Sequence, residues 1–184
     1  FFLHYQPQVT IKTGKMEGAE ALARWQSMDA GLVPPADFIP VAEETGLITD
    51  IGRRVLRMAC LQNKRIHDAG HPLIMAVNIS SRQFKQGDFT SMVTQILKET
   101  GLPPKYLELE FTESIIMENS EEIIRKMREL KSFGIRFSID DFGTGFSSLS
   151  YLKRMPIDML KIDRSFVQGI TQSADDASIA IAII

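Results

Sequence analysis

Short apolar runs alternate along the chain with longer amphipathic stretches. The runs at 73–79, 106–112, 135–140 and 157–162 have the length and apolar content of buried strands. The stretches between them repeat apolar residues every three or four positions, which is the period of an amphipathic helix. Strands that alternate with helices in this way are joined by crossover connections, so the pattern predicts an α/β fold with a mainly parallel sheet.

The chain is expected to open with a hairpin. Strands are predicted at 2–11 and 16–25, on either side of a turn at 13–15. Pro7 lies within the first of these strands and has no backbone N–H to donate. This strand is therefore expected at an edge of the sheet or at a bulge.

Proline, glycine and capping residues predict where the helices begin and end. The prolines in 31–40 predict a loop, followed by a short helix at 40–45 that ends at Gly46. Further helix starts are expected at Thr49 or Asp50, at Asp88 and near Ser173.

Five predicted strands each carry a polar residue at or near the C-terminal end. In an open doubly wound sheet these residues would spread along one edge. In a (β/α)₈ barrel the same strand ends converge on one mouth, where barrel enzymes keep their catalytic groups. Polar residues on so many strands favour the barrel. They are Glu20, Asn78, Glu110, Asp140 and Lys161.

Two adjacent carboxylates, Asp140 and Asp141, follow a short apolar strand and precede a loop that contains Gly143 and Gly145. Neighbouring carboxylates repel each other unless a positive charge lies close to them. Oxygen ligands of this kind suit the hard cations Mg²⁺ and Mn²⁺. The alternative is a solvated loop in which the aspartates only form a turn.

A barrel mouth with these carboxylates and one amide has the ligands for a pair of metal ions, which suits phosphodiester hydrolysis. Here Lys161 would orient the attacking water or neutralise charge that develops on the phosphate. Glu20, Leu22 and Arg24 share one face of their strand, so Arg24 is positioned to bind a second phosphate. An enolase-like proton abstraction also uses carboxylates and a lysine at a barrel mouth, and it is the second class of reaction to consider.

Glu113 lies one step beyond the carboxylates of its strand. It is better placed to brace the Gly143–Gly145 loop, by accepting hydrogen bonds from the backbone or from Ser147.

Composition narrows the possible functions. The chain has 184 residues, of which 44% are hydrophobic and 24% charged, with a net charge of −2, as in an ordinary soluble domain. The absence of a basic excess argues against binding to long nucleic acid. Cys60 is the single cysteine, so no internal disulfide is possible, which fits a reducing compartment such as the cytoplasm. No apolar run is long enough to cross a bilayer.

Six segments in order along the chain resemble the motifs of the EAL domain family. The match is specific because the segments keep their register over almost the whole sequence. They are Tyr5-Gln6-Pro7, Glu20-Ala21-Leu22-Ala23-Arg24-Trp25, Val77-Asn78-Ile79-Ser80, Glu108-Leu109-Glu110-Phe111-Thr112-Glu113, Asp140-Asp141-Phe142-Gly143-Thr144-Gly145 and Lys161-Ile162-Asp163.

The resemblance implies a modified (β/α)₈ TIM-like barrel with an antiparallel first strand. It also implies a bacterial phosphodiesterase that opens cyclic di-GMP to linear pGpG with Mg²⁺ or Mn²⁺. By position, the metal ligands are Glu20, Asn78, Glu110, Asp140 and Asp141. Catalytic roles fall to Lys161, Glu20 and Asp140, nucleotide contacts to Gln6, Leu22, Arg24 and Asp163, and loop or dimer contacts to Glu113 and Ser147.

The resemblance also covers the protein around the domain. Such domains commonly form homodimers and follow a GGDEF or sensor domain, in proteins that are often attached to the membrane. The family continues with strands that carry Glu-Gly-Val-Glu and Gln-Gly motifs, and this chain stops before them. The sequence is therefore expected to be an EAL domain over residues 1–184 that lacks its last strands.

Two other functions remain open. Some members of the family bind cyclic di-GMP without cleaving it, but those usually lose the first glutamate or the Asp-Asp pair, and this chain keeps both. The third possibility is a structural fragment that only dimerises.

Overall fold

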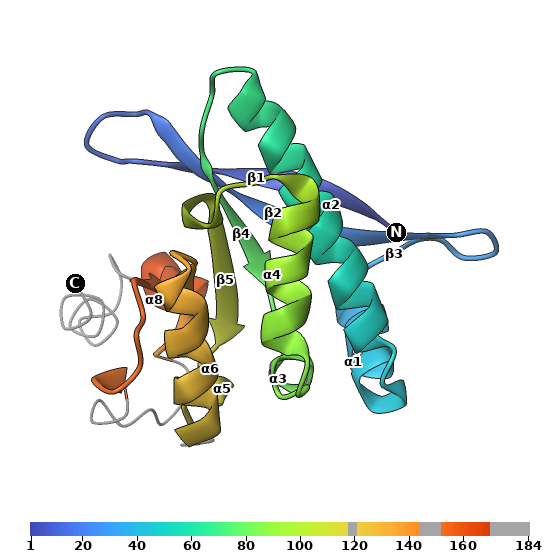
Figure 1. The fold of residues 1–184 in the computed structure, drawn as a ribbon. Helices are drawn as coiled ribbons and strands as arrows, with labels where there is room; N and C mark the ends of the chain where they lie inside the picture. Colours follow the sequence, from blue (N-terminus) through green and yellow to red (C-terminus); the bar gives the residue numbers. More distant parts are fainter. Residues whose placement is uncertain (118–120, 144–151, 170–184) are drawn as a thin grey trace.

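The computed structural model describes residues 1–117, 121–143 and 152–169. In this part of the chain the strands form one seven-stranded sheet in the order β1-β2-β4-β5-β6-β7, with β3 paired to β2 (Figure 1). The strands are β1 (Phe2–Val9), β2 (Met16–Ser27), β3 (Gly31–Val33), β4 (Ile74–Asn78), β5 (Leu107–Thr112), β6 (Arg136–Phe142) and β7 (Met159–Ile162).

Strand β1 is antiparallel to β2, whereas β2, β4, β5, β6 and β7 pair in parallel. The antiparallel first strand that the family resemblance implied is thus present. Within the described residues β1 and β7 are the two outer strands of the main sheet. The edge position of β1 explains how Pro7 is accommodated, because an edge strand tolerates a residue that has no N–H to donate.

Helices α2, α4 and α6 lie side by side on one face of the sheet (Figure 1). This face is apolar because alternate residues of each strand, such as Met75, Leu109 and Phe137, pack against the helices and are fully buried. The helical segments are α1 (Pro35–Thr45), α2 (Ile48–Asp68), α3 (Ser81–Phe84), α4 (Phe89–Thr100), η1 (Pro104–Tyr106), α5 (Ser114–Met117), α6 (Glu121–Ser132) and α8 (Arg164–Gly169).

The opposite face of the central strands is polar. Glu108 and Glu110, two residues apart, lie on this face of β5 and are buried. Arg136 on the neighbouring strand pairs with Glu108, with 3.5 Å between Nε and Oε2. A parallel sheet with buried polar residues on one face and packed helices on the other is typical of a barrel wall.

The prediction of a loop at 31–40 was wrong. Residues 31–33 form β3, and α1 starts at Pro35, directly after Pro34. Proline suits the first turn of a helix, where its missing N–H is not needed. Pro40 lies inside α1, where the burial of Phe38 and Ala42 against the rest of the fold outweighs the lost backbone hydrogen bond.

Other boundaries differ less. Helix α2 begins at Ile48, one residue before the expected start, and β1 ends at Val9 because a register shift follows Gln8. Asp88 precedes α4 as expected, but its side chain makes no capping hydrogen bond and pairs instead with Arg53. The helix expected near Ser173 lies outside the described residues.

None of the helices that the structure describes combines the length and the apolar character needed to span a bilayer.

Candidate metal and nucleotide site

Parallel pairing brings the polar strand ends together. Asn78 is paired in register with Glu110, and Thr112 is paired with Asp140. As a result, carboxylate oxygens of Glu20, Glu110 and Asp140 lie within 4.8 Å of one another. Three of the five residues predicted as metal ligands therefore form one cluster, contributed by β2, β5 and β6.

The donor set of this cluster fits a hard divalent cation, because every candidate ligand atom is an oxygen. Glu110 is fully buried, and its Oε1 forms an ion pair with Nζ of Lys161. Burial raises the pKa of Glu110 to about 7, against the lowering effect of Lys161. A cation beside this buried carboxylate, whether an ammonium or a metal ion, stabilises its charged form.

Asn78 lies beside the carboxylates at the exposed end of β4. Its Nδ2 donates to Oε1 of Glu20 at 2.8 Å, so the amide oxygen is not used in this contact. That oxygen is the atom with which Asn78 would serve as a neutral ligand.

Lys161 reaches the carboxylate cluster from β7. Its Nζ lies 3.0 Å from Glu20 Oε2 and 3.3 Å from Asp140 Oδ1, and it also pairs with Glu110 Oε1. Burial alone would lower the pKa of Lys161, but the hydrogen bond and charge of Glu110, followed by the charge of Glu20, raise it above the usual value. The lysine is thus held as an ammonium ion.

Asp141 is not one of the three clustered carboxylates. It adopts φ of 54°, in the left-handed region, at a point where the pairing of β6 with β7 shifts register. Burial raises its pKa, and the neighbouring charge of Asp140 and a hydrogen bond with Asp163 act in the same direction.

Asp163 has a contact that the sequence interpretation missed. Its Oδ1 accepts from the backbone N–H of Ser165 at 2.8 Å and also from the hydroxyl of Ser165. These hydrogen bonds lower the pKa of Asp163. The side chain therefore caps the start of α8, and the Asp-Arg-Ser sequence is the capping signal that predicts this helix.

Glu113 makes the backbone contact that its position suggested. Gly143 donates its N–H to Glu113 Oε2 at 3.1 Å, and Glu113 is buried. The start of the loop after β6 is thus tied to the end of β5. Gly145 and Ser147, the other residues assigned to this loop, lie outside the described residues.

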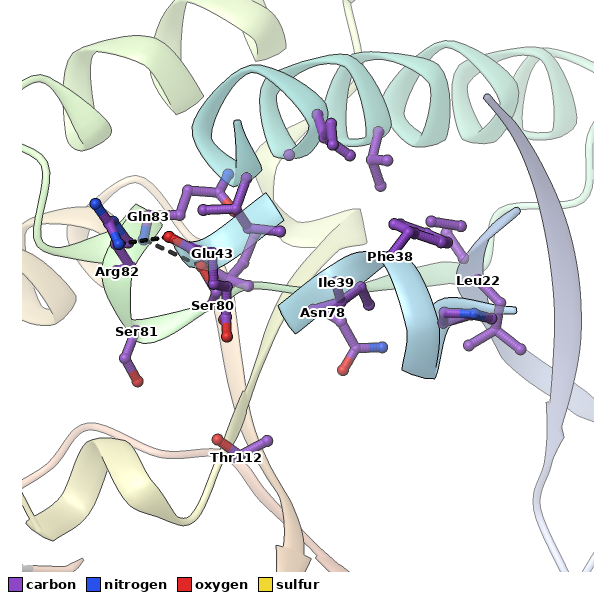
Figure 2. A pocket seen from close by; sticks show the side chains of 18 of the residues that line it. Leu22, Phe38, Ile39, Glu43, Asn78, Ser80, Ser81, Arg82, Gln83 and Thr112 are labelled. Carbon is purple, nitrogen blue, oxygen red and sulfur yellow. Dashed lines mark hydrogen bonds between the residues drawn. The ribbon is translucent and has the colours of Figure 1, made fainter. Parts of the chain in front are cut away.

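A cavity of about 920 Å³ lies next to the cluster, because Asn78, which donates to Glu20, is part of its lining. The lining does not include Glu20, Glu110, Asp140 or Lys161. Leu22, Arg24 and Asn78, three of the residues predicted to bind ligand or metal, are part of its lining. Figure 2 shows Leu22 and Asn78 among the lining residues. Gln6 is not in the lining, although it is paired in register with Glu20 at the edge of the sheet.

The sequence interpretation missed the contribution of α1 and α3 to this cavity. Phe38 and Ile39 come from α1, in the segment expected to be a loop, and Arg82 comes from α3. Arg82 donates to the backbone carbonyl of Glu43, which connects the two helices across the cavity wall (Figure 2). The apolar spacing of Phe38 and Ala42 was the available signal for α1.

Comparison with known proteins identifies this combination of fold and site. The family model described as EAL domain matches residues 1–184, so the chain belongs to the EAL domain family. Signaling protein YkoW of Bacillus subtilis is 50% identical over the whole chain, which covers 23% of that protein. The diguanylate cyclase/cyclic di-GMP phosphodiesterase MucR of Pseudomonas aeruginosa is 45% identical over 99% of the chain, which covers 27% of that protein.

Solved structures agree with this assignment. The phosphodiesterase PaMucR in complex with c-di-GMP has a TM-score of 0.93 and 45% identity, covering 98% of this chain and 74% of that one. The EAL domain of Mycobacterium smegmatis DcpA has a TM-score of 0.80 and 34% identity, and the match covers 100% of this chain and 72% of that one. The predicted TIM-like α/β fold is thereby confirmed. The chain spans about a quarter of the length of the curated relatives named above.

Proposed function

We propose that this domain is a metal-dependent phosphodiesterase that hydrolyses cyclic di-GMP to linear pGpG. The observation that carries the proposal is the convergence of Glu20, Glu110 and Asp140, from three strands, beside a cavity lined by Arg24. Relatives named as cyclic di-GMP phosphodiesterases, such as PdeR of Escherichia coli at 41% identity, support the substrate.

The cluster supplies the ligands for Mg²⁺ or Mn²⁺. Glu20, Glu110, Asp140 and the amide oxygen of Asn78 would hold one ion, and Asp141 would contribute to a second. When bound, such ions lower the pKa of coordinated water and withdraw charge from the phosphate.

The remaining residues act on the substrate. Arg24 has the fork of donors that suits a phosphate, and with Leu22 it faces the cavity in which the nucleotide would bind. Lys161 carries a positive charge at the reacting end and can stabilise charge on the phosphate or hold the attacking water. We assign Gln6 and Asp163 to nucleotide contacts at the rim only by the family resemblance.

The second candidate is a receptor that binds cyclic di-GMP without cleaving it. The intact set of acidic residues disfavours this function, because a receptor does not need the buried charge of Glu110.

The curated relatives are longer signalling proteins, so we expect the domain to act within one, joined to a GGDEF or sensor domain and paired as a homodimer.

Hydrolysis of cyclic di-GMP by the natural full-length protein tests the proposal. With Mg²⁺ present, pGpG should appear, and chelation of the metal should stop its formation. Glu20→Gln should reduce the rate about a hundredfold or more, because it removes a charged ligand. Glu17→Gln, at an exposed position of the same strand, is the matched control and should leave the rate unchanged. Nucleotide binding without any pGpG would identify a receptor instead.

A further inference from the structure

Lys161 occupies the position in the carboxylate cluster where a metal ion would bind. Its ammonium contacts one oxygen from each of Glu20, Glu110 and Asp140. Oxygens of these same three residues form the only group of potential metal ligands found among the described residues. The lysine therefore compensates the negative charge of three strands at once.

The cluster has space for one central cation. The carboxylate oxygens of the three residues are within 4.8 Å of one another. Mg²⁺ binds each oxygen ligand at about 2.1 Å, so one ion can contact oxygens that are this far apart. An ion that contacts all three carboxylates would thus lie between the same oxygens as the ammonium. Two cations at that separation repel strongly, so both cannot occupy the centre.

We propose that Lys161 is a resident cation that holds the carboxylate cluster together without metal and that a divalent ion must displace it. The inference rests on the proposed metal site but concerns a step before any substrate binds. It gives Lys161 a role in metal occupancy that is separate from its proposed role in hydrolysis.

The side chain of Lys161 has the most freedom to move among the members of the cluster. Glu110 is fully buried, whereas the lysine side chain is 23% exposed, close to the 26% of Asp140, and has a flexible four-carbon stem. The charge of Asp141 already acts on Lys161, so a displaced ammonium has another carboxylate close by. Displacement would therefore need only a local change in the side-chain conformation of Lys161, with no change in the strands of the sheet.

Binding of Mn²⁺ alone to the natural full-length protein, followed by electron paramagnetic resonance, tests the competition. Lys161→Met should bind Mn²⁺ about tenfold or more tightly than the wild type, because the competing charge is gone. Lys64→Met, which removes the same charge from a surface ion pair on α2, is the control and should not change the affinity. Unchanged or weaker binding by Lys161→Met overturns the proposal.

Thermal stability separates competition from a purely structural role. In chelator, Lys161→Met should melt below the wild type, because three carboxylates lose their counter-ion. With saturating Mn²⁺ the difference should vanish or change sign. A variant that is equally destabilised in both conditions shows that the lysine is merely structural.

If Lys161→Met fails to fold, amine labelling of the wild type tests whether Mn²⁺ displaces the ammonium of Lys161. Acetic anhydride followed by mass spectrometry should modify Lys161 faster with Mn²⁺ than with chelator, while Lys64 is unaffected. Slower or unchanged labelling of Lys161 refutes displacement. None of these three measurements uses cyclic di-GMP, so a failure of the proposed hydrolysis would leave their results interpretable.

Discussion

The buried lysine of α6, Lys126, gives the sharpest test of how the segment after β4 is held. Its side chain is 6% exposed, and its Nζ donates to the backbone carbonyls of Lys85 and Gln86 at 3.0 Å and of Phe84 at 3.4 Å. These carbonyls lie at the end of α3, where a helix leaves acceptors without intrahelical partners. The Lys126→Met variant keeps the apolar stem and removes the donors.

The expected cost follows from two opposing contributions. Hydrogen bonds from a charged donor stabilise by about 1.5–3 kcal/mol each, and two of the three have good length. Burial of the ammonium costs several kcal/mol, which the variant recovers. The net loss in the free energy of unfolding should therefore be about 1–3 kcal/mol.

Urea denaturation of wild type and variants measures this difference. Glu122→Gln is the matched control, because Glu122 pairs with Lys126 at 3.1 Å but is 60% exposed. Loss of this exposed ion pair in Glu122→Gln should lower the free energy of unfolding by less than about 1 kcal/mol. Amide hydrogen exchange at residues 84–89 should accelerate in Lys126→Met and not in Glu122→Gln.

A Lys126→Met protein as stable as the wild type would refute this reasoning. It would mean that the cost of burying the ammonium equals the gain from its hydrogen bonds. Equal losses in both variants would instead assign the stabilisation to the ion pair.

Three further outcomes are expected. Gly52→Ala should lower the free energy of unfolding by about 1–3 kcal/mol in urea denaturation, because a Cβ there would lie 2.3 Å from Oε1 of the buried Gln83. The loss of stability should be smaller when Gln83 is also replaced by alanine. Burial raises the pKa of Cys60 to about 12, so at pH 8 its thiol should react with Ellman's reagent only after unfolding; rapid reaction of folded protein would contradict this. Asn63→Leu should cost about 2 kcal/mol of unfolding free energy, since its buried amide donates to two backbone carbonyls at 3.1 and 3.0 Å; an unchanged urea midpoint would count against those bonds.

The sequence by itself determined six of the seven described strands and the class of fold. A compact apolar run marks β4, and alternation of apolar residues with glutamates marks β5, because a strand covered by helices on one face must bury that face completely. The period of two placed Glu108 and Glu110 on a common face, and the structure keeps them there. Both inferences depend only on the spacing of residues that are close together in the sequence.

Tertiary structure alone decided how the polar residues meet. Lys161 is 141 residues from Glu20, and only the pairing of β7 with β6 places its ammonium among the carboxylates. The left-handed backbone of Asp141 likewise depends on a register shift between neighbouring strands. Helix α1 forms although its prolines predict a loop, because packing outweighs local preference. Strand register and burial arise from contacts between distant residues, and local sequence patterns do not encode them.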